Sequence, residues 1–84
     1  MTITEGSKNI LNYLLKRAIS MGDLNYLFAI DHKSLTKELA LESENYCTVC
    51  FQYLVQFRYV QWCTDNDSNL YSITAEGIEF LETN

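Results

Sequence analysis

The sequence predicts a single α+β domain, in which three helices precede a β-hairpin and a short helix follows it. Apolar residues recur at three- and four-residue spacing over residues 8–20 and 44–57, as they do in amphipathic helices. Two runs rich in β-forming residues, 60–64 and 70–74, flank a five-residue segment of turn formers, which predicts a hairpin. With 84 residues the chain has room for one modest core, so we expect one domain over residues 1–84.

The composition, 48% hydrophobic and 20% charged, is that of a globular protein. No apolar run approaches the roughly 20 residues of a membrane span. The N-terminal residues MTITEGSKN lack the basic start and apolar stretch of a signal peptide. Three cysteines, an odd number without an export signal, favour reduced thiols. We therefore expect a cytoplasmic protein that makes no membrane contact.

The first helix is expected to begin at a cap on Thr4 or Ser7 and to run to about Ser20. Gly22 follows, where a helix commonly ends in a left-handed conformation. Alternation over residues 23–31 suits a short strand, although continued helix remains an alternative there. The inward stripe of the first helix is Ile10, Leu11, Leu14, Leu15, Ala18 and Ile19.

Asp31 or Ser34 is expected to cap a second helix, with Leu35, Leu39 and Ala40 turned inward. A turn at residues 41–43 leads to a third helix over residues 44–57. The inward residues of the third helix are Cys47, Cys50, Phe51, Leu54 and Phe57, and its outward residues are Asn45, Thr48, Gln52 and Gln56.

The chain closes on the run LYSITAEGIEFL, residues 70–81, in which Thr74 is expected to cap the last helix. This run resembles the "Y-x-[LI]-T-x-x-G-x-x-[FY]-L" ending of small bacterial and phage winged-helix proteins. Residues of the second helix, the third helix and the start of the hairpin also match the apolar pattern of these proteins: Leu35, Leu39, Cys47, Phe51, Leu54 and Val60. Over residues 8–82 the chain therefore resembles the winged helix-turn-helix superfamily. The resemblance implies a three-helix core, a β-hairpin wing, a short C-terminal helix and, in many members, transcription regulation through DNA binding by the third helix.

The chain departs from the family pattern at two places. Arg58 and Tyr59 stand where the turn before the hairpin often carries glycine. Members that bind DNA usually carry basic residues on the third helix and in the wing, whereas this chain is acidic there. Its third helix offers Glu44, Asn45, Thr48 and Gln52, and its wing tip is Asp65, Asn66 and Asp67.

The charge distribution argues against DNA as the partner. Residues 38–84 hold eight acids and only one base, Arg58, so this half has a net charge of −7. Phosphate neutralisation supplies most nonspecific DNA affinity, and carboxylates in its place are repulsive. A DNA-binding regulator remains the alternative interpretation. The residues that would contact DNA are Lys33, Lys37, Asn45, Thr48, Gln52 and Arg58.

A metal site and an active site are weaker interpretations. Cys47, Cys50, Cys63 and His32 are ligand types that zinc accepts. However, the first two lie on the inward stripe, where free cysteine behaves as a small hydrophobe. We interpret His32 as a solvated residue without a nucleophile partner. We expect no metal, no cofactor and no enzymatic activity.

Protein binding is the function that we expect. Tyr13, Tyr46, Tyr53 and Tyr59 fall at the edges of the apolar stripes, and tyrosine is enriched at interface cores. The acidic half suits a partner with a basic surface, and an inhibitor or adaptor of a nucleic-acid-binding protein fits best. Both interpretations allow a homodimer. The expected partner-binding residues are Glu44, Asn45, Thr48, Gln52, Tyr53, Asp65 and Asp67.

Overall fold

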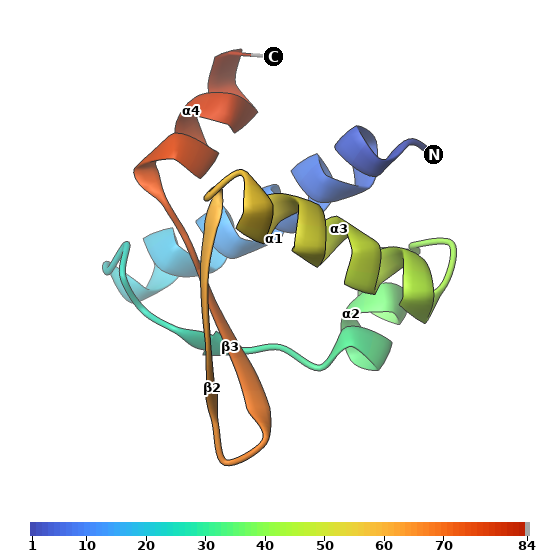
Figure 1. Ribbon diagram of the computed structural model, residues 1–84. Helices are drawn as coiled ribbons and strands as arrows, with labels where there is room; N and C mark the ends of the chain where they lie inside the picture. The colour runs from blue at the N-terminus through green and yellow to red at the C-terminus, as the bar shows by residue number, and fades with distance from the viewer. Residues whose placement is uncertain (84) are drawn as a thin grey trace.

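The computed structural model describes residues 1–83, which form four helices and a three-stranded antiparallel sheet (Figure 1). The helices are α1 (Ile3–Met21), α2 (His32–Glu38), α3 (Glu44–Gln56) and α4 (Ala75–Thr83). The strands β1 (Phe28–Ala29), β2 (Val60–Asp65) and β3 (Ser68–Ile73) pair in the order β1-β3-β2. The predicted α+β class is confirmed, and the order of the elements is compatible with a winged-helix layout. Within the described residues, none of the helices is both long and apolar enough to cross a membrane.

The first helix starts earlier than its sequence pattern predicted. Thr2 caps α1, because its hydroxyl accepts from the Glu5 amide while the Glu5 carboxylate accepts from the Thr2 amide. Thr4 and Ser7 are therefore not caps, and Ser7 is buried instead. The C-terminal prediction is confirmed, since Gly22 adopts a left-handed φ of 67°.

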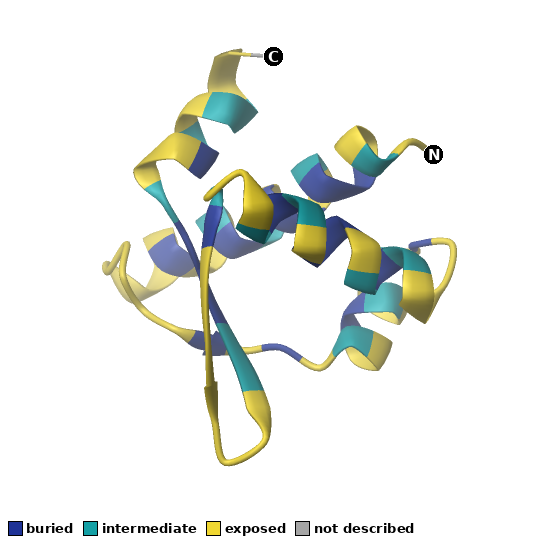
Figure 2. Cartoon of the chain, viewed as in Figure 1, coloured by how far each residue is buried: buried dark blue, intermediate teal, exposed yellow. Residues whose placement is uncertain are grey.

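One apolar core joins α1, α3 and the inner face of the sheet (Figure 2). The inward stripes were predicted correctly near the middle of each helix and wrongly at the ends. Ile19 is 70% exposed because the last turn of α1 extends past the core, and Phe57 is 55% exposed because α3 ends at Gln56. The buried residues of the two stripes are Ile10, Leu11, Leu14, Ala18, Cys47, Cys50, Phe51 and Leu54.

The connection between α1 and α2 contains less strand than the alternation indicated. The strand consists of Phe28 and Ala29, opposite Tyr71 and Leu70 of β3, and the Ile30 amide donates to the Asn69 carbonyl beyond its end. Asp31 precedes α2 as predicted for a cap, but its carboxylate makes no capping bond and accepts instead from the Ser34 hydroxyl at 2.7 Å. Ala40, predicted to face inward, is exposed in the turn after α2 with a φ of 53°, so this prediction was wrong.

The hairpin is longer and tighter than predicted. β2 and β3 pair as far as Asp65 opposite Ser68, which leaves a two-residue turn rather than a five-residue linker. Asn66 and Asp67 both have positive φ, 49° and 65°, the geometry of a type I′ turn. Asparagine and aspartate tolerate this conformation better than most residues. The hairpin consequently projects away from the helices as a narrow two-stranded arm (Figure 1).

The Thr74-x-x-Gly77 pattern has a structural explanation. The Thr74 hydroxyl accepts from the Gly77 amide and donates to the Arg58 carbonyl, so it caps α4 and also holds the turn after α3. Gly77 lies so close to this turn that a Cβ atom would stand 2.2 Å from the Tyr59 carbonyl oxygen. Arg58 adopts a φ of 61°, so the turn after α3 takes a left-handed conformation without a glycine.

The Gly77→Ala substitution should destabilise the fold by about 1–3 kcal/mol, because the added methyl group meets backbone that cannot move without displacing β2. Urea unfolding followed by circular dichroism measures the change. The control is Glu79→Ala on the exposed side of α4, which should change stability by less than about 0.5 kcal/mol. Equal effects of the two substitutions would contradict this account of Gly77.

Candidate binding site

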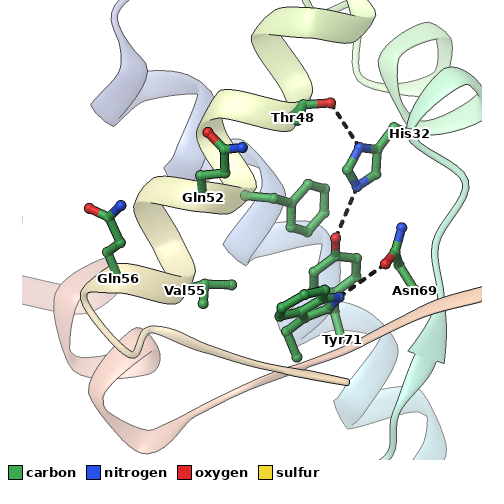
Figure 3. A pocket seen from close by; sticks show the side chains of 9 residues that line it. His32, Thr48, Gln52, Val55, Gln56, Asn69 and Tyr71 are labelled. Carbon is green, nitrogen blue, oxygen red and sulfur yellow. Dashed lines mark hydrogen bonds between the residues drawn. The ribbon is translucent and has the colours of Figure 1, made fainter. Parts of the chain in front are cut away.

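A pocket of about 340 Å³ opens between α3 and the hairpin (Figure 3). Its volume lies at the lower end of the range of ligand pockets. Side chains from α2, α3, β2 and β3 surround it, so the pocket exists only when the hairpin is folded against the helices. The lining residues are His32, Thr48, Phe51, Gln52, Val55, Gln56, Trp62, Asn69 and Tyr71.

Stacked rings fix the position of the pocket. The Phe51 ring from α3 lies 4.2 Å from the Tyr71 ring of β3 and 4.8 Å from the His32 imidazole of α2, measured between ring centroids. Phe51 and Tyr71 are almost fully buried. Offset aromatic stacking of this kind adds to the stabilisation from apolar burial. The three rings therefore hold α2, α3 and the hairpin in fixed relative positions beside the pocket.

Hydrogen bonds engage both ring nitrogens of His32 (Figure 3). With the Thr48 hydroxyl donating to the Glu44 carbonyl at 3.1 Å, its oxygen accepts from His32 Nδ1, which is 3.1 Å away. Nε2 then lacks a proton and accepts from the Tyr71 hydroxyl at 3.0 Å. The geometry thus fits a neutral imidazole protonated at Nδ1.

The prediction of a solvated His32 was wrong, because the side chain is half-buried in this network. Burial lowers the pKa of the imidazole below its ordinary value, and the Glu44 and Asp31 carboxylates oppose that shift. His32 therefore acts as a neutral, structural member of the pocket wall.

Trp62 provides an exposed apolar wall on the hairpin side. It lies opposite Tyr71 in the β2–β3 register, yet 50% of its surface is exposed. Its indole N–H donates to the Asn69 side-chain oxygen at 3.1 Å, which holds the ring in place (Figure 3). A large apolar side chain that is fixed and exposed beside a pocket is a typical feature of binding surfaces.

An acidic recess adjoins the pocket. Asp31, Glu44 and Asp67 line this second hollow, and His32 and Asn69 line both hollows. Asp67 reaches it because the type I′ turn ends the hairpin there, and Glu44 reaches it because it begins α3. Three carboxylates from three separate segments thus stand beside a largely apolar pocket.

The predicted partner-binding residues divide between these hollows and other surfaces. Thr48 and Gln52 line the pocket, while Glu44 and Asp67 line the acidic recess. Asn45 and Asp65 are exposed but line neither hollow. Tyr53 is half-buried and packs on Phe57 at 4.8 Å between ring centroids, away from the pocket.

The cations named for DNA contact do not form one patch. Lys33 and Lys37 are exposed on α2, next to the N-terminal part of α3 (Figure 1). Arg58 follows the other end of α3, which at 1.5 Å per residue is about 20 Å long. The exposed side of α3 between them carries Asn45, Gln52 and Gln56 but no lysine or arginine.

The potential zinc ligands also lie apart. Cys47 and Cys50 are buried in the core, where burial raises the pKa of each thiol, whereas Cys63 is exposed on β2. Across residues 1–83, no three or more His, Cys, Asp or Glu side chains are grouped so that they could hold a metal ion.

Several pocket residues were not named as site residues in the sequence analysis, although α3 carried a signal for three of them. Phe51, Val55 and Gln56 recur at three- and four-residue spacing with the predicted Thr48 and Gln52, so all five share one side of the helix. Trp62, Asn69 and Tyr71 gave no comparable signal, because their place beside α3 depends on how the hairpin packs on the helices in the tertiary structure.

Comparisons of the chain with protein-family models, with curated proteins and with solved structures found no match.

We expect the pH dependence of stability between pH 7 and 5 to come largely from His32. Because its pKa is lowered in the folded state, the unfolded chain takes up a proton first as the pH falls. Stability should be complete above about pH 6.5 and should decrease below it. Urea unfolding at several pH values measures this decrease.

The His32→Gln variant should be less stable at pH 7 but should lose less further stability at pH 5. Lys33→Gln, at the neighbouring exposed position, is the control and should keep the wild-type pH dependence. The carboxylates of Glu5 and Asp31 do not titrate between pH 7 and 5, because hydrogen bonds lower their pKa values below 4.5 and 3.8. An unchanged pH dependence in His32→Gln would contradict the assignment.

Proposed function

We propose that the chain is a winged-helix domain, similar to small bacterial and phage proteins, that binds a protein partner with a basic surface and has no enzymatic activity. The fold proposal rests on the order helix, strand, two helices, hairpin and on the β1-β3-β2 sheet. In this layout α3 takes the place of the recognition helix and the hairpin that of the wing. The three free thiols fit a reducing compartment, so we propose the cytoplasm.

The observation that supports protein binding is the combination of charge and apolar surface between α3 and the hairpin. Asp31, Glu44 and Asp67 line one hollow, and aromatic rings line the adjoining one. Nucleic acid would bring its phosphates to these carboxylates, which is repulsive. A basic protein surface is attracted to them and can bury the exposed Trp62 at the same time. An inhibitor or adaptor that occupies the groove of a nucleic-acid-binding protein has these properties.

His32 and two of the three cysteines are engaged in structural contacts, which supports a non-enzymatic role. Both ring nitrogens of His32 are held by Thr48 and Tyr71. The Cys47 and Cys50 thiols are buried, and their raised pKa values keep them protonated and weakly nucleophilic.

A DNA-binding regulator is the competing function, and it is tested directly by fluorescence anisotropy of mixed-sequence duplex DNA at low salt. Low salt strengthens every lysine and arginine contact with phosphate, so this condition favours DNA binding most. We expect no saturable binding. Saturable binding that weakens steeply with salt, and that is lost in a Lys33→Gln, Lys37→Gln variant, would replace the proposed function with the DNA-binding one.

Charge reversal tests the proposed protein interface. The Glu44→Lys, Asp67→Lys variant should lose proteins that the wild type retains in a pull-down, because two carboxylates of the acidic recess become cations. The matched control is Glu79→Lys, Glu82→Lys, which makes the same change of net charge on exposed positions of α4. Proteins retained in the pull-down and then purified should bind the Glu79→Lys, Glu82→Lys control at least about tenfold more tightly than the Glu44→Lys, Asp67→Lys variant. Equal retention by both variants would contradict the proposed interface.

A further inference from the structure

We infer that the partner docks by placing an aromatic side chain in the pocket between α3 and the hairpin, with a lysine or arginine next to it in the acidic recess. This inference rests on the proposed function and specifies what the basic partner presents. The relevant hollows are the 340 Å³ pocket and the recess beside it.

The pocket suits an aromatic ring because of what forms its walls. Phe51 and Tyr71, almost fully buried, form its apolar floor, and the Trp62 indole stands exposed on the hairpin side. A ring placed over this floor can stack on the exposed Trp62 indole or meet its edge, the two arrangements that aromatic pairs prefer. It would also remove the Trp62 surface from water, which is the main source of affinity in such a contact.

Two side chains at the rim of the pocket are held in place by hydrogen bonds before any ligand binds. The Trp62 indole is held by its hydrogen bond to Asn69, and His32 is held by Thr48 and Tyr71. Little side-chain entropy is then lost when a ligand enters, since these walls are fixed beforehand. The pocket is therefore preorganised, which raises the affinity of an anchoring side chain.

The negative charge of the acidic recess determines which partner residue can lie next to the aromatic anchor. Asp31, Glu44 and Asp67 line the recess, and the described residues that line it include no lysine or arginine. His32 and Asn69 line both hollows, so the aromatic ring in the pocket and the cation in the recess would be adjacent. The lowered pKa of His32 keeps its imidazole neutral. A cation within one or two residues of the aromatic anchor can therefore enter the recess, where opposite charge favours it.

Trp62 is the only tryptophan of the chain, and its emission reports on the pocket directly. The probe is the capped tripeptide Arg-Phe-Arg, which contains no tryptophan. The matched peptides are Arg-Ala-Arg, which lacks the ring, and Gln-Phe-Gln, which lacks the charge.

We expect Arg-Phe-Arg to shift the Trp62 emission to shorter wavelength and to saturate. Arg-Ala-Arg should bind about tenfold more weakly because it buries no ring. Gln-Phe-Gln should bind several-fold more weakly, with a difference that disappears at high salt.

Two variants with the same substitution locate the site. Val55→Phe places a larger side chain in the pocket wall and should abolish the response to Arg-Phe-Arg. Val49→Phe, on the same helix but exposed outside the pocket, should leave the response unchanged. Circular dichroism verifies that both variants fold. If Val55→Phe does not fold, Gln52→Phe at an exposed position of the pocket rim replaces it.

Each contrary result overturns a distinct statement. Equal binding of Arg-Ala-Arg and Arg-Phe-Arg would overturn the aromatic anchor and leave the acidic interface of the proposed function intact. Equal binding of Gln-Phe-Gln at all salt concentrations would indicate an uncharged aromatic ligand and overturn both proposals. No response to any peptide at millimolar concentration would overturn the anchor, while the charge-reversal pull-down still decides the proposed function. Trp62 emission that changes with protein concentration alone would assign the pocket to a second copy of the chain.

Discussion

The cluster of the Phe51, His32 and Tyr71 rings, each in contact with the other two, is the contact on which the arrangement of this protein depends. It joins the consecutive helices α2 and α3 to β3, which follows later in the sequence, by rings whose centroids lie 4.2 Å and 4.8 Å from that of Phe51. The hydrogen bonds of His32 to Thr48 and Tyr71 add direction to this apolar contact. Because buried polar groups must keep their partners, the network admits only a narrow range of positions for the hairpin relative to α3.

The same contact explains why the surface between α3 and the hairpin is concave. The rings of Phe51 and Tyr71 hold the base of the hairpin against α3, while the outer part of the hairpin projects into solvent (Figures 1 and 2). Trp62 and Asn69 lie where the hairpin leaves the helices, and Gln52 and Gln56 lie opposite them on α3. A hollow therefore remains where the hairpin separates from α3.

The position of the carboxylates follows from local backbone chemistry. Glu44 lies in the first turn of α3, where a carboxylate complements the helix dipole, and Asp67 lies in a turn whose positive φ suits aspartate. Each residue is thus compatible with a purely local role. Their joint presence in one recess with Asp31 gives that side of the domain its charge and is the basis of the proposed preference for a basic partner.

The sequence alone determined the α+β class, the middle of each helix stripe, the two hairpin strands and the caps at Gly22 and Thr74. These features depend on periodicity and on residues that act within one turn of the chain. Only the tertiary structure decided the half-burial of His32, the exposure of Phe57 and Ile19, and the meeting of Trp62 with α3. Such features depend on where helices end relative to the core and on contacts between residues far apart in the chain. Local pattern does not encode those distances, so the pocket became visible only once the hairpin was packed against α3.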